Sequence, residues 1–211
     1  MKPISVLLAG VALAGCAAAA PPEVLRQWQA QPRFTCCNMH YENRGSLTDA
    51  NYFVGAALPA GTPASVEAIH DRALTFRAGS GDLFTITQVY GVDQESADRF
   101  FGKLLVEMDP RPGIAAFPPA VRDAIADGRV EVGMTREQVL LSLGYPPTHR
   151  TASLDMTTWT YWYNRWRTYQ VQFNGARQVS AVVGSRAPTR GEPVAAIAPA
   201  PLAPAAPPRR Y

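Results

Sequence analysis

The chain has 211 residues, enough for one domain or two small ones, and 47% of them are apolar, so a buried core is expected. The formal net charge is +3, but residues 34–185 carry 13 basic and 15 acidic side chains, a balance of −2. Because the basic excess lies in the flanks, the composition argues against a protein that binds nucleic acid through a basic face.

Residues 1–15 have the features of a secretory signal peptide. Lys2 supplies the positive start, and the apolar stretch that follows is too short to span a bilayer. The segment ends in Leu13-Ala14-Gly15-Cys16, which resembles the lipobox of bacterial lipoproteins. That resemblance implies cleavage before Cys16 and acylation of Cys16, with two or three acyl chains such as palmitate holding the chain in the lipid bilayer.

The residues after Cys16 bear on the destination of the lipoprotein. Ala17 and Ala18 follow, with no Asp in the position that resembles an inner-membrane retention signal, so we expect a periplasm-facing anchor in the outer membrane. Residues 16–33 show little periodicity and contain a proline pair, which predicts a tether between the lipid and the first folded element.

Cys36 and Cys37 are adjacent, and a secreted protein is exposed to conditions that permit disulfides. Their Cα atoms should be about 3.8 Å apart, which is below the usual range for a disulfide. Three interpretations stay open: two thiols or a strained pair with a possible redox role, an intermolecular or mixed disulfide, and metal binding together with His40. Cys-Cys-x-x-His offers too few ligands for a closed zinc site, so we expect no metal.

Residues 34–111 have the turn residues and alternating runs of a small β-rich domain, and the run LPAGTPASV at residues 58–66 weakly resembles the opening of an SH3-like barrel. Short alternating runs separated by turn residues predict strands, and Asp93 is a candidate N-cap for one helix. The expected elements are strands over 51–58, 65–69, 72–77 and 83–90, a helix over 93–103 and a short strand at 104–106. The run Asp109-Pro110-Arg111-Pro112-Gly113 interrupts the alternation of strands and marks the candidate domain boundary.

Residues 112–185 begin with signals for two helices. Pro118-Pro119 opens a short helix that Asp127-Gly128 ends. Thr135 is placed as the N-cap of the next helix, with Gln138 completing a capping box. Gly144 before a proline pair ends that helix.

The pattern then changes from helical to alternating. Trp159, Tyr161 and Tyr163 should share one face of a strand, and Tyr169, Val171 and Phe173 one face of the next. Asn174-Gly175 predicts a two-residue type I′ hairpin, with Gly175 at positive φ, before a third strand over 179–183. The result is an α+β unit of two helices and a three-stranded antiparallel meander.

These elements carry a family resemblance. Gly133-Met134-Thr135, Gln138-Val139, Leu143-Gly144-Tyr145-Pro146, Trp159 with Tyr161, and Val171-Gln172-Phe173 before Gly175 are similar to the SmpA/OmlA domain of BamE-type lipoproteins. The resemblance covers residues 120–184 and implies an ααβββ fold. It also implies a scaffold or accessory role in outer-membrane protein assembly or envelope maintenance, with barrel or assembly proteins as partners. Such domains also resemble a family of secreted β-lactamase inhibitors.

The aromatic run is the candidate partner-binding site. Alternation places Trp162 on the face opposite Trp159, and Arg165 and Arg167 flank Trp166 in the connecting loop. Aromatic residues and arginine are enriched at protein interfaces. Two interpretations stay open: the rings form a seam with the N-terminal domain, or they bind a partner.

No nucleophile, base and stabiliser can be grouped from the sequence, so we expect neither an enzyme nor a cofactor. Residues 186–211 are rich in proline and alanine, and we expect a disordered spacer there. The leading hypothesis is a non-enzymatic outer-membrane lipoprotein. The alternative is an inhibitor-like module that binds a protein or glycan through an exposed aromatic sheet face.

Overall fold

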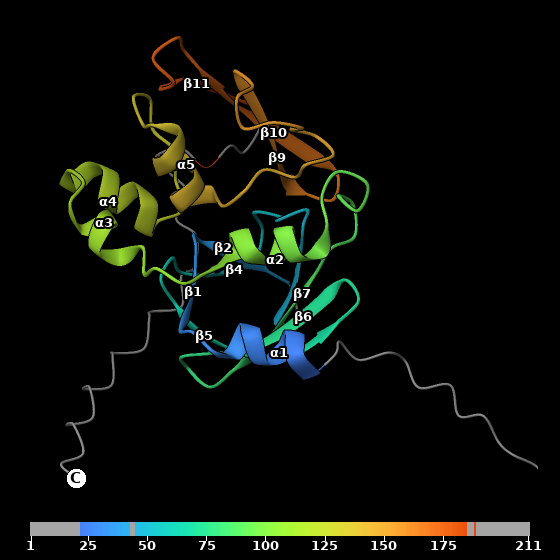
Figure 1. Cartoon of the computed structure of the whole chain (residues 1–211). Coiled ribbons are helices and arrows are strands. Elements are labelled where there is room, and N and C mark those ends of the chain that lie inside the picture. Colours follow the sequence, from blue (N-terminus) through green and yellow to red (C-terminus); the bar gives the residue numbers. More distant parts are fainter. Residues whose placement is uncertain (1–21, 43–44, 185–187, 189–211) are drawn as a thin grey trace, which may run out of the picture.

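A computed structural model describes residues 22–42, 45–184 and 188 (Figure 1). The first element is helix α1 (Pro22–Gln29), and its Val24, Leu25 and Trp28 pack against the N-terminal core. The tether that we predicted over residues 16–33 is therefore wrong from residue 22 onward, because α1 has an apolar face that the core buries. Within the described part of the chain, no helix is both long and apolar enough to cross a membrane.

The N-terminal half is built on a curled six-stranded sheet. Its strands, in spatial order, are β3 (Ser46–Thr48), β7 (Leu83–Thr87), β6 (Ala73–Ala78), β5 (Pro63–His70), β1 (Arg33–Thr35) and β8 (Leu105–Val106). All neighbours pair antiparallel except β3 and β7, which are parallel. A second sheet pairs β2 (Met39–Tyr41) with β4 (Ala56–Leu58). The SH3-like comparison stays a prediction.

Several N-terminal elements differ from the predicted ones: β1, β2 and β3 were not predicted, and β7 ends at Thr87 rather than at residue 90. Helix α2 spans Ala97–Leu104, and its N-cap is Ser96, whose hydroxyl accepts from Arg99 N, so Asp93 was the wrong cap. The strand predicted over 51–58 is only β4, and residues 51–55 form a loop instead. Phe53 in this loop points into the C-terminal core, which outweighs its own preference for a strand.

The C-terminal half has α+β architecture, as expected. Short helix α3 (Arg111–Ala115) precedes α4 (Pro119–Ala126) and α5 (Arg136–Leu143). Three antiparallel strands follow in the order β11 (Val179–Val183), β10 (Arg167–Phe173) and β9 (Thr158–Asn164). The predicted capping box is present, since Thr135 Oγ1 accepts from Gln138 N and Gln138 Oε1 accepts from Thr135 N.

The hairpin between β10 and β11 is not the predicted two-residue turn. Arg177 N donates to Asn174 O, and Asn174 Oδ1 accepts from both Ala176 N and Gln178 N. The left-handed residue of this longer turn is Arg177, with φ 59°, and Gly175 is not in that region. The Asn-Gly signal therefore marked the turn correctly but gave the wrong type, because the asparagine side chain closes a wider loop.

Two hydrophobic clusters form the core, one in each half. The halves are joined through the C-terminal end of α5: Asn38 Nδ2 donates to Ser142 O at 3.0 Å, and Asn51 Nδ2 donates to Leu143 O at 2.7 Å. Phe53 N also donates to Trp162 O at 3.0 Å, so the loop extends the edge of β9. The two asparagine bonds satisfy carbonyls at the end of α5 that would otherwise lack partners. The division into domains near residue 111 stays a prediction.

Candidate partner-binding surface

The tip of the β9–β10 hairpin presents a tryptophan to solvent. Trp166 is 87% exposed, and Arg165 and Arg167 beside it are exposed as well. Asn164 fixes the backbone of the tip, because its Oδ1 accepts from Trp166 N at 2.9 Å and from Arg167 N at 3.0 Å. The indole is thus held out from a turn that is already ordered, which lowers the entropic cost of binding through it.

Trp162 lies nearby on the outer face of β9 and is half-buried. Its ring meets the Tyr52 ring edge-on, with centroids 6.4 Å apart. The guanidinium of Arg150 lies 5.0 Å from the centroid of the Trp162 ring, within cation–π range. Trp162 therefore belongs to the surface, and its contacts cross from the C-terminal half to the loop that carries Tyr52.

The aromatic contacts continue from Tyr52 to Tyr90. The two hydroxyl oxygens are 3.2 Å apart, and the Tyr90 ring lies 5.4 Å from that of His149. Burial, followed by the hydrogen bond to Tyr90, raises the pKa of Tyr52 to about 12, so its hydroxyl stays protonated at neutral pH. Burial also lowers the pKa of His149, with a further contribution from Arg150, which favours the neutral imidazole.

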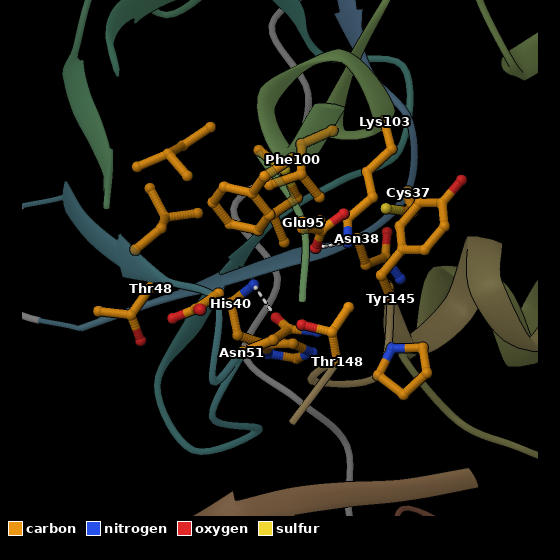
Figure 2. Close-up of a pocket in the computed structure, with 17 residues that line it drawn as sticks. Cys37, Asn38, His40, Thr48, Asn51, Glu95, Phe100, Lys103, Tyr145 and Thr148 are labelled. Atoms are coloured by element: carbon orange, nitrogen blue, oxygen red, sulfur yellow. Dashed lines mark hydrogen bonds and ion pairs between the residues drawn. The ribbon is translucent and has the colours of Figure 1, made fainter. Parts of the chain in front are cut away.

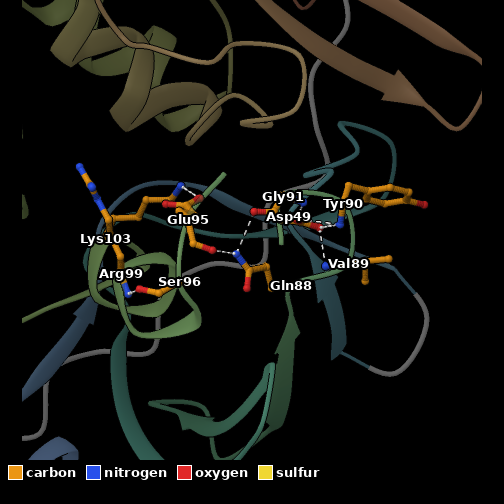
Figure 3. A network of polar contacts seen from close by, with 9 residues as sticks. All are labelled: Asp49, Gln88, Val89, Tyr90, Gly91, Glu95, Ser96, Arg99 and Lys103. Atoms are coloured by element: carbon orange, nitrogen blue, oxygen red, sulfur yellow. Dashed lines mark hydrogen bonds and ion pairs between the residues drawn. The ribbon is translucent and has the colours of Figure 1, made fainter. Parts of the chain in front are cut away.

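A buried carboxylate holds the loop that carries Tyr90 (Figure 3). Asp49 accepts from the backbone N–H groups of Val89, Tyr90 and Gly91, with its shortest contact 2.6 Å to Gly91 N. Gln88 Nε2 donates to Gly91 O and Glu95 O and so closes the loop from the other side. Hydrogen bonds from three backbone N–H groups to one carboxylate are strong because they are charge-assisted. They hold this part of the surface rigid.

We call the set of Tyr52, Tyr90, Trp162 and Trp166, with Arg150 and Arg165, the aromatic surface. Arg165 follows β9, and its Nη2 lies 3.1 Å from Glu42 Oε2, so this ion pair joins the hairpin to the N-terminal half. An exposed pair of this kind contributes little to stability, so Arg165 can exchange Glu42 for an acidic group on a partner. Stacking and hydrogen bonding are what these side chains offer, which is binding rather than bond-making chemistry.

The two cysteines form a disulfide with each other in the N-terminal core. Cys37 is 1% exposed and Cys36 is partly exposed. Both sulfurs are bonded to each other, so neither is a free thiolate in the structure. In residues 22–42 and 45–184, moreover, no three potential ligands come together.

His40 lies in the seam and lines the same small cavity as Cys37. It is 3% exposed, its ring packs 4.9 Å from that of Phe53, and among the described residues neither ring nitrogen has a partner. Burial lowers its pKa to about 4. His40 borders a cavity of about 30 Å³, shown in Figure 2, which has room for roughly one water.

The same cavity contains an ion pair between Lys103 and Glu95. Burial lowers the pKa of Lys103, and the bond to Glu95 opposes that shift. The Lys103 ammonium also lies 5.2 Å from the ring centroid of Tyr145, which comes from the segment after α5. The pair thus helps to fix the seam beneath the aromatic surface.

Comparison with known protein families assigns the C-terminal half. Residues 123–183 match the family model of the outer membrane protein assembly factor BamE domain. The match confirms the resemblance that we inferred from the sequence, and it includes α5 and all three strands of the meander. No curated protein and no solved structure shows significant similarity to the chain.

All four residues predicted to bind a partner lie within the segment that matches the BamE domain model: Trp162, Arg165, Trp166 and Arg167. The structure brings Trp162 and Arg165 together with Tyr52 and Tyr90, which our sequence analysis missed. Tyr52 fell inside a predicted strand. The sequence signal that could have revealed it is the aromatic pair Tyr52-Phe53 between Asn51 and Gly55, two residue types that favour turns. Cys16, the predicted lipidation site, lies outside the described residues.

Proposed function

We propose that this protein is a non-enzymatic accessory factor of outer-membrane protein assembly that binds a protein partner through the aromatic surface. We further propose that acylated Cys16 anchors it in the outer membrane, with the folded part facing the periplasm. The BamE domain supports a role in assembly, since the family is named for an assembly factor.

The observation that carries the proposal is Trp166, 87% exposed at the tip of a hairpin that Asn164 holds in place. Exposed tryptophan is unfavourable in water, and interfaces concentrate binding energy in tryptophan, tyrosine and arginine. Trp166 stands between Arg165 and Arg167, on the hairpin whose outer face carries Trp162, so a partner would bury several such residues together.

The outer face of the sheet beyond Trp162 supports a protein partner. The side chains there are polar, with Thr160 opposite Gln170 and Thr158 opposite Gln172 in the strand register. A binding surface with an aromatic centre and a polar rim is the usual arrangement of a protein interface. The partner should therefore carry an apolar pocket for Trp166 and acidic groups near Arg165 and Arg167.

A photo-reactive residue at position 166 tests the proposal in native membranes, with adducts identified by mass spectrometry. The matched control carries the same residue at Ala176, at the exposed tip of the other hairpin. We expect adducts with barrel or assembly proteins from position 166 and far fewer from position 176. Equal yields from both tips, or adducts with soluble periplasmic proteins alone, would reject an assembly role and favour the inhibitor-like alternative.

A further inference from the structure

A second hollow lies between α3, α5 and strand β8. Its volume is about 390 Å³, within the range of ligand-binding clefts. Apolar side chains from both halves border it, including Ile114, Phe117, Leu140, Leu141 and Tyr145. We call it the sulfur groove, because Cys36, Cys37 and Met108 also line it.

The three sulfur atoms give the groove a preference for aromatic rings. Divalent sulfur makes favourable contacts with aromatic ring edges, in addition to the gain from burying apolar area. Met108 is 83% exposed at the rim, an unusual position for a flexible apolar side chain with no cover. An occupant with one aromatic ring would cover Met108 and meet the disulfide below it.

The charge at the rim is acidic. Glu137 and Asp109 both border the groove, and Asp109 is already paired with Arg111 at 2.6 Å. Among the described residues, Glu137 has no ion-pair partner, and it is exposed at the first turn of α5. The occupant should therefore carry a positive charge next to its aromatic ring.

One segment of this chain has that chemistry. Residues 189–211 contain a single aromatic residue, Tyr211, and it directly follows Arg209 and Arg210. We propose that Tyr211 occupies the sulfur groove, with the preceding arginines against Glu137.

The starting point of that segment makes the contact reachable. Pro188 O accepts from Val130 N at 2.9 Å, and Val130 lies just beyond α4, which packs on α5. The 23 residues from 189 to 211 can extend roughly 70 Å at the polyproline II rise, so they reach around the helix pair with slack. A tether of this kind gives an effective concentration of about a millimolar, so a weak contact is enough for substantial occupancy.

The test uses the full chain with a photo-reactive residue in place of Met108, which is exposed enough to accept it. After irradiation, cleavage before Asp155, the last aspartate of the sequence, releases residues 155–211 as one fragment, and tandem mass spectrometry locates the adducts within it. A mixture of light and heavy isotope-labelled protein separates adducts within one molecule from adducts between copies. The control position is Leu83, which is 50% exposed on the N-terminal sheet.

We expect an intramolecular adduct between position 108 and residues 193–211, with little from position 83. Tyr211→Ala and Arg209→Glu/Arg210→Glu should each reduce its yield at least about fivefold while leaving the melting temperature unchanged. The proposal is overturned if position 108 gives no adduct within residues 193–211, gives adducts only between copies or with another protein, or gives a yield that these substitutions do not change.

Discussion

On strand β9 the side chains of Trp159, Tyr161 and Tyr163 point into the core, whereas Trp162 lies on the opposite face and Trp166 stands at the tip. The first three are buried, and the rings of Tyr161 and Tyr169 stack there with centroids 5.6 Å apart. The outer pair contacts Tyr52, Arg150 and solvent instead. β alternation therefore divides the aromatic side chains of β9 into an inner set that builds the core and an outer residue, Trp162, which together with Trp166 we propose as a binding surface.

The largest expected effect on stability comes from the inner set. Trp159 is fully buried against Phe173, with ring centroids 4.6 Å apart. Trp159→Ala should lower the free energy of unfolding by about 3 to 5 kcal/mol, because it removes a large side chain and leaves a cavity. Urea denaturation followed by circular dichroism measures the change. A loss below about 1 kcal/mol would mean that the inner face is not the core.

Acid should weaken the seam through His40. Its pKa in the fold is about 4, below the ordinary value of 6.5, so the unfolded chain takes up a proton first as pH falls. The stability from neutral His40 is therefore complete above pH 6.5 and declines toward pH 4, by roughly 3 kcal/mol in total.

Denaturation curves between pH 7 and pH 4 test this, with His40→Phe as the matched variant. Phenylalanine keeps a ring against Phe53 but cannot titrate, so its stability should fall less steeply over the same interval. Parallel curves for the two proteins would show that His40 is not the group responsible.

The β10–β11 hairpin offers a second test, at Arg177 and Gly175. Arg177 has φ 59°, a conformation that costs a non-glycine residue about 1 kcal/mol, so Arg177→Gly should raise stability by roughly 0.5 to 1 kcal/mol. Gly175 is outside the left-handed region, and no atom lies within 4 Å of the place that a Cβ would take there. Gly175→Val should therefore change stability by less than about 0.5 kcal/mol. Thermal melts measure both changes. If Gly175→Val lowers the melting temperature and Arg177→Gly does not raise it, the type I′ turn with Gly175 at positive φ is correct and the turn described here is wrong.

The smallest effect on folding is expected at the tip of the β9–β10 hairpin. Trp166 is almost fully exposed, so Trp166→Ala should change the free energy of unfolding by no more than about 0.5 kcal/mol. Urea denaturation of the variant and of the unchanged protein measures this difference in the free energy of unfolding. A larger loss would place Trp166 among the residues that stabilise the fold.

Local signals predicted most of the C-terminal half. The capping box at Thr135, the glycine after α5 and the alternation of β9 and β10 each act over a few residues, so a single sequence is enough to read them. The same reasoning failed where contacts between residues far apart in the sequence determine the local structure. Phe53 leaves the predicted strand for the core of the other half, and the apolar face of α1 is recognisable only once its sheet is present.

The candidate surface was predictable in part for the same reason. Alternation separated Trp162 from Trp159, and the loop composition singled out Trp166. Tyr52 and Tyr90 come from segments more than 70 residues away, and only the tertiary fold brings them to Trp162. The two asparagines that bond the carbonyls at the end of α5 were equally invisible, since their partners lie about 100 residues further along the chain.

The most direct test of the central claim is co-purification from native membranes with full-length Trp166→Ala, quantified by mass spectrometry. Leu83→Ala removes an exposed apolar side chain elsewhere and serves as the control. We predict that Trp166→Ala reduces recovery of outer-membrane barrel or assembly proteins about tenfold, which corresponds to about 1.4 kcal/mol of binding energy, while Leu83→Ala leaves it unchanged. Equal recovery with both variants would contradict the assignment of the aromatic surface as the partner-binding site.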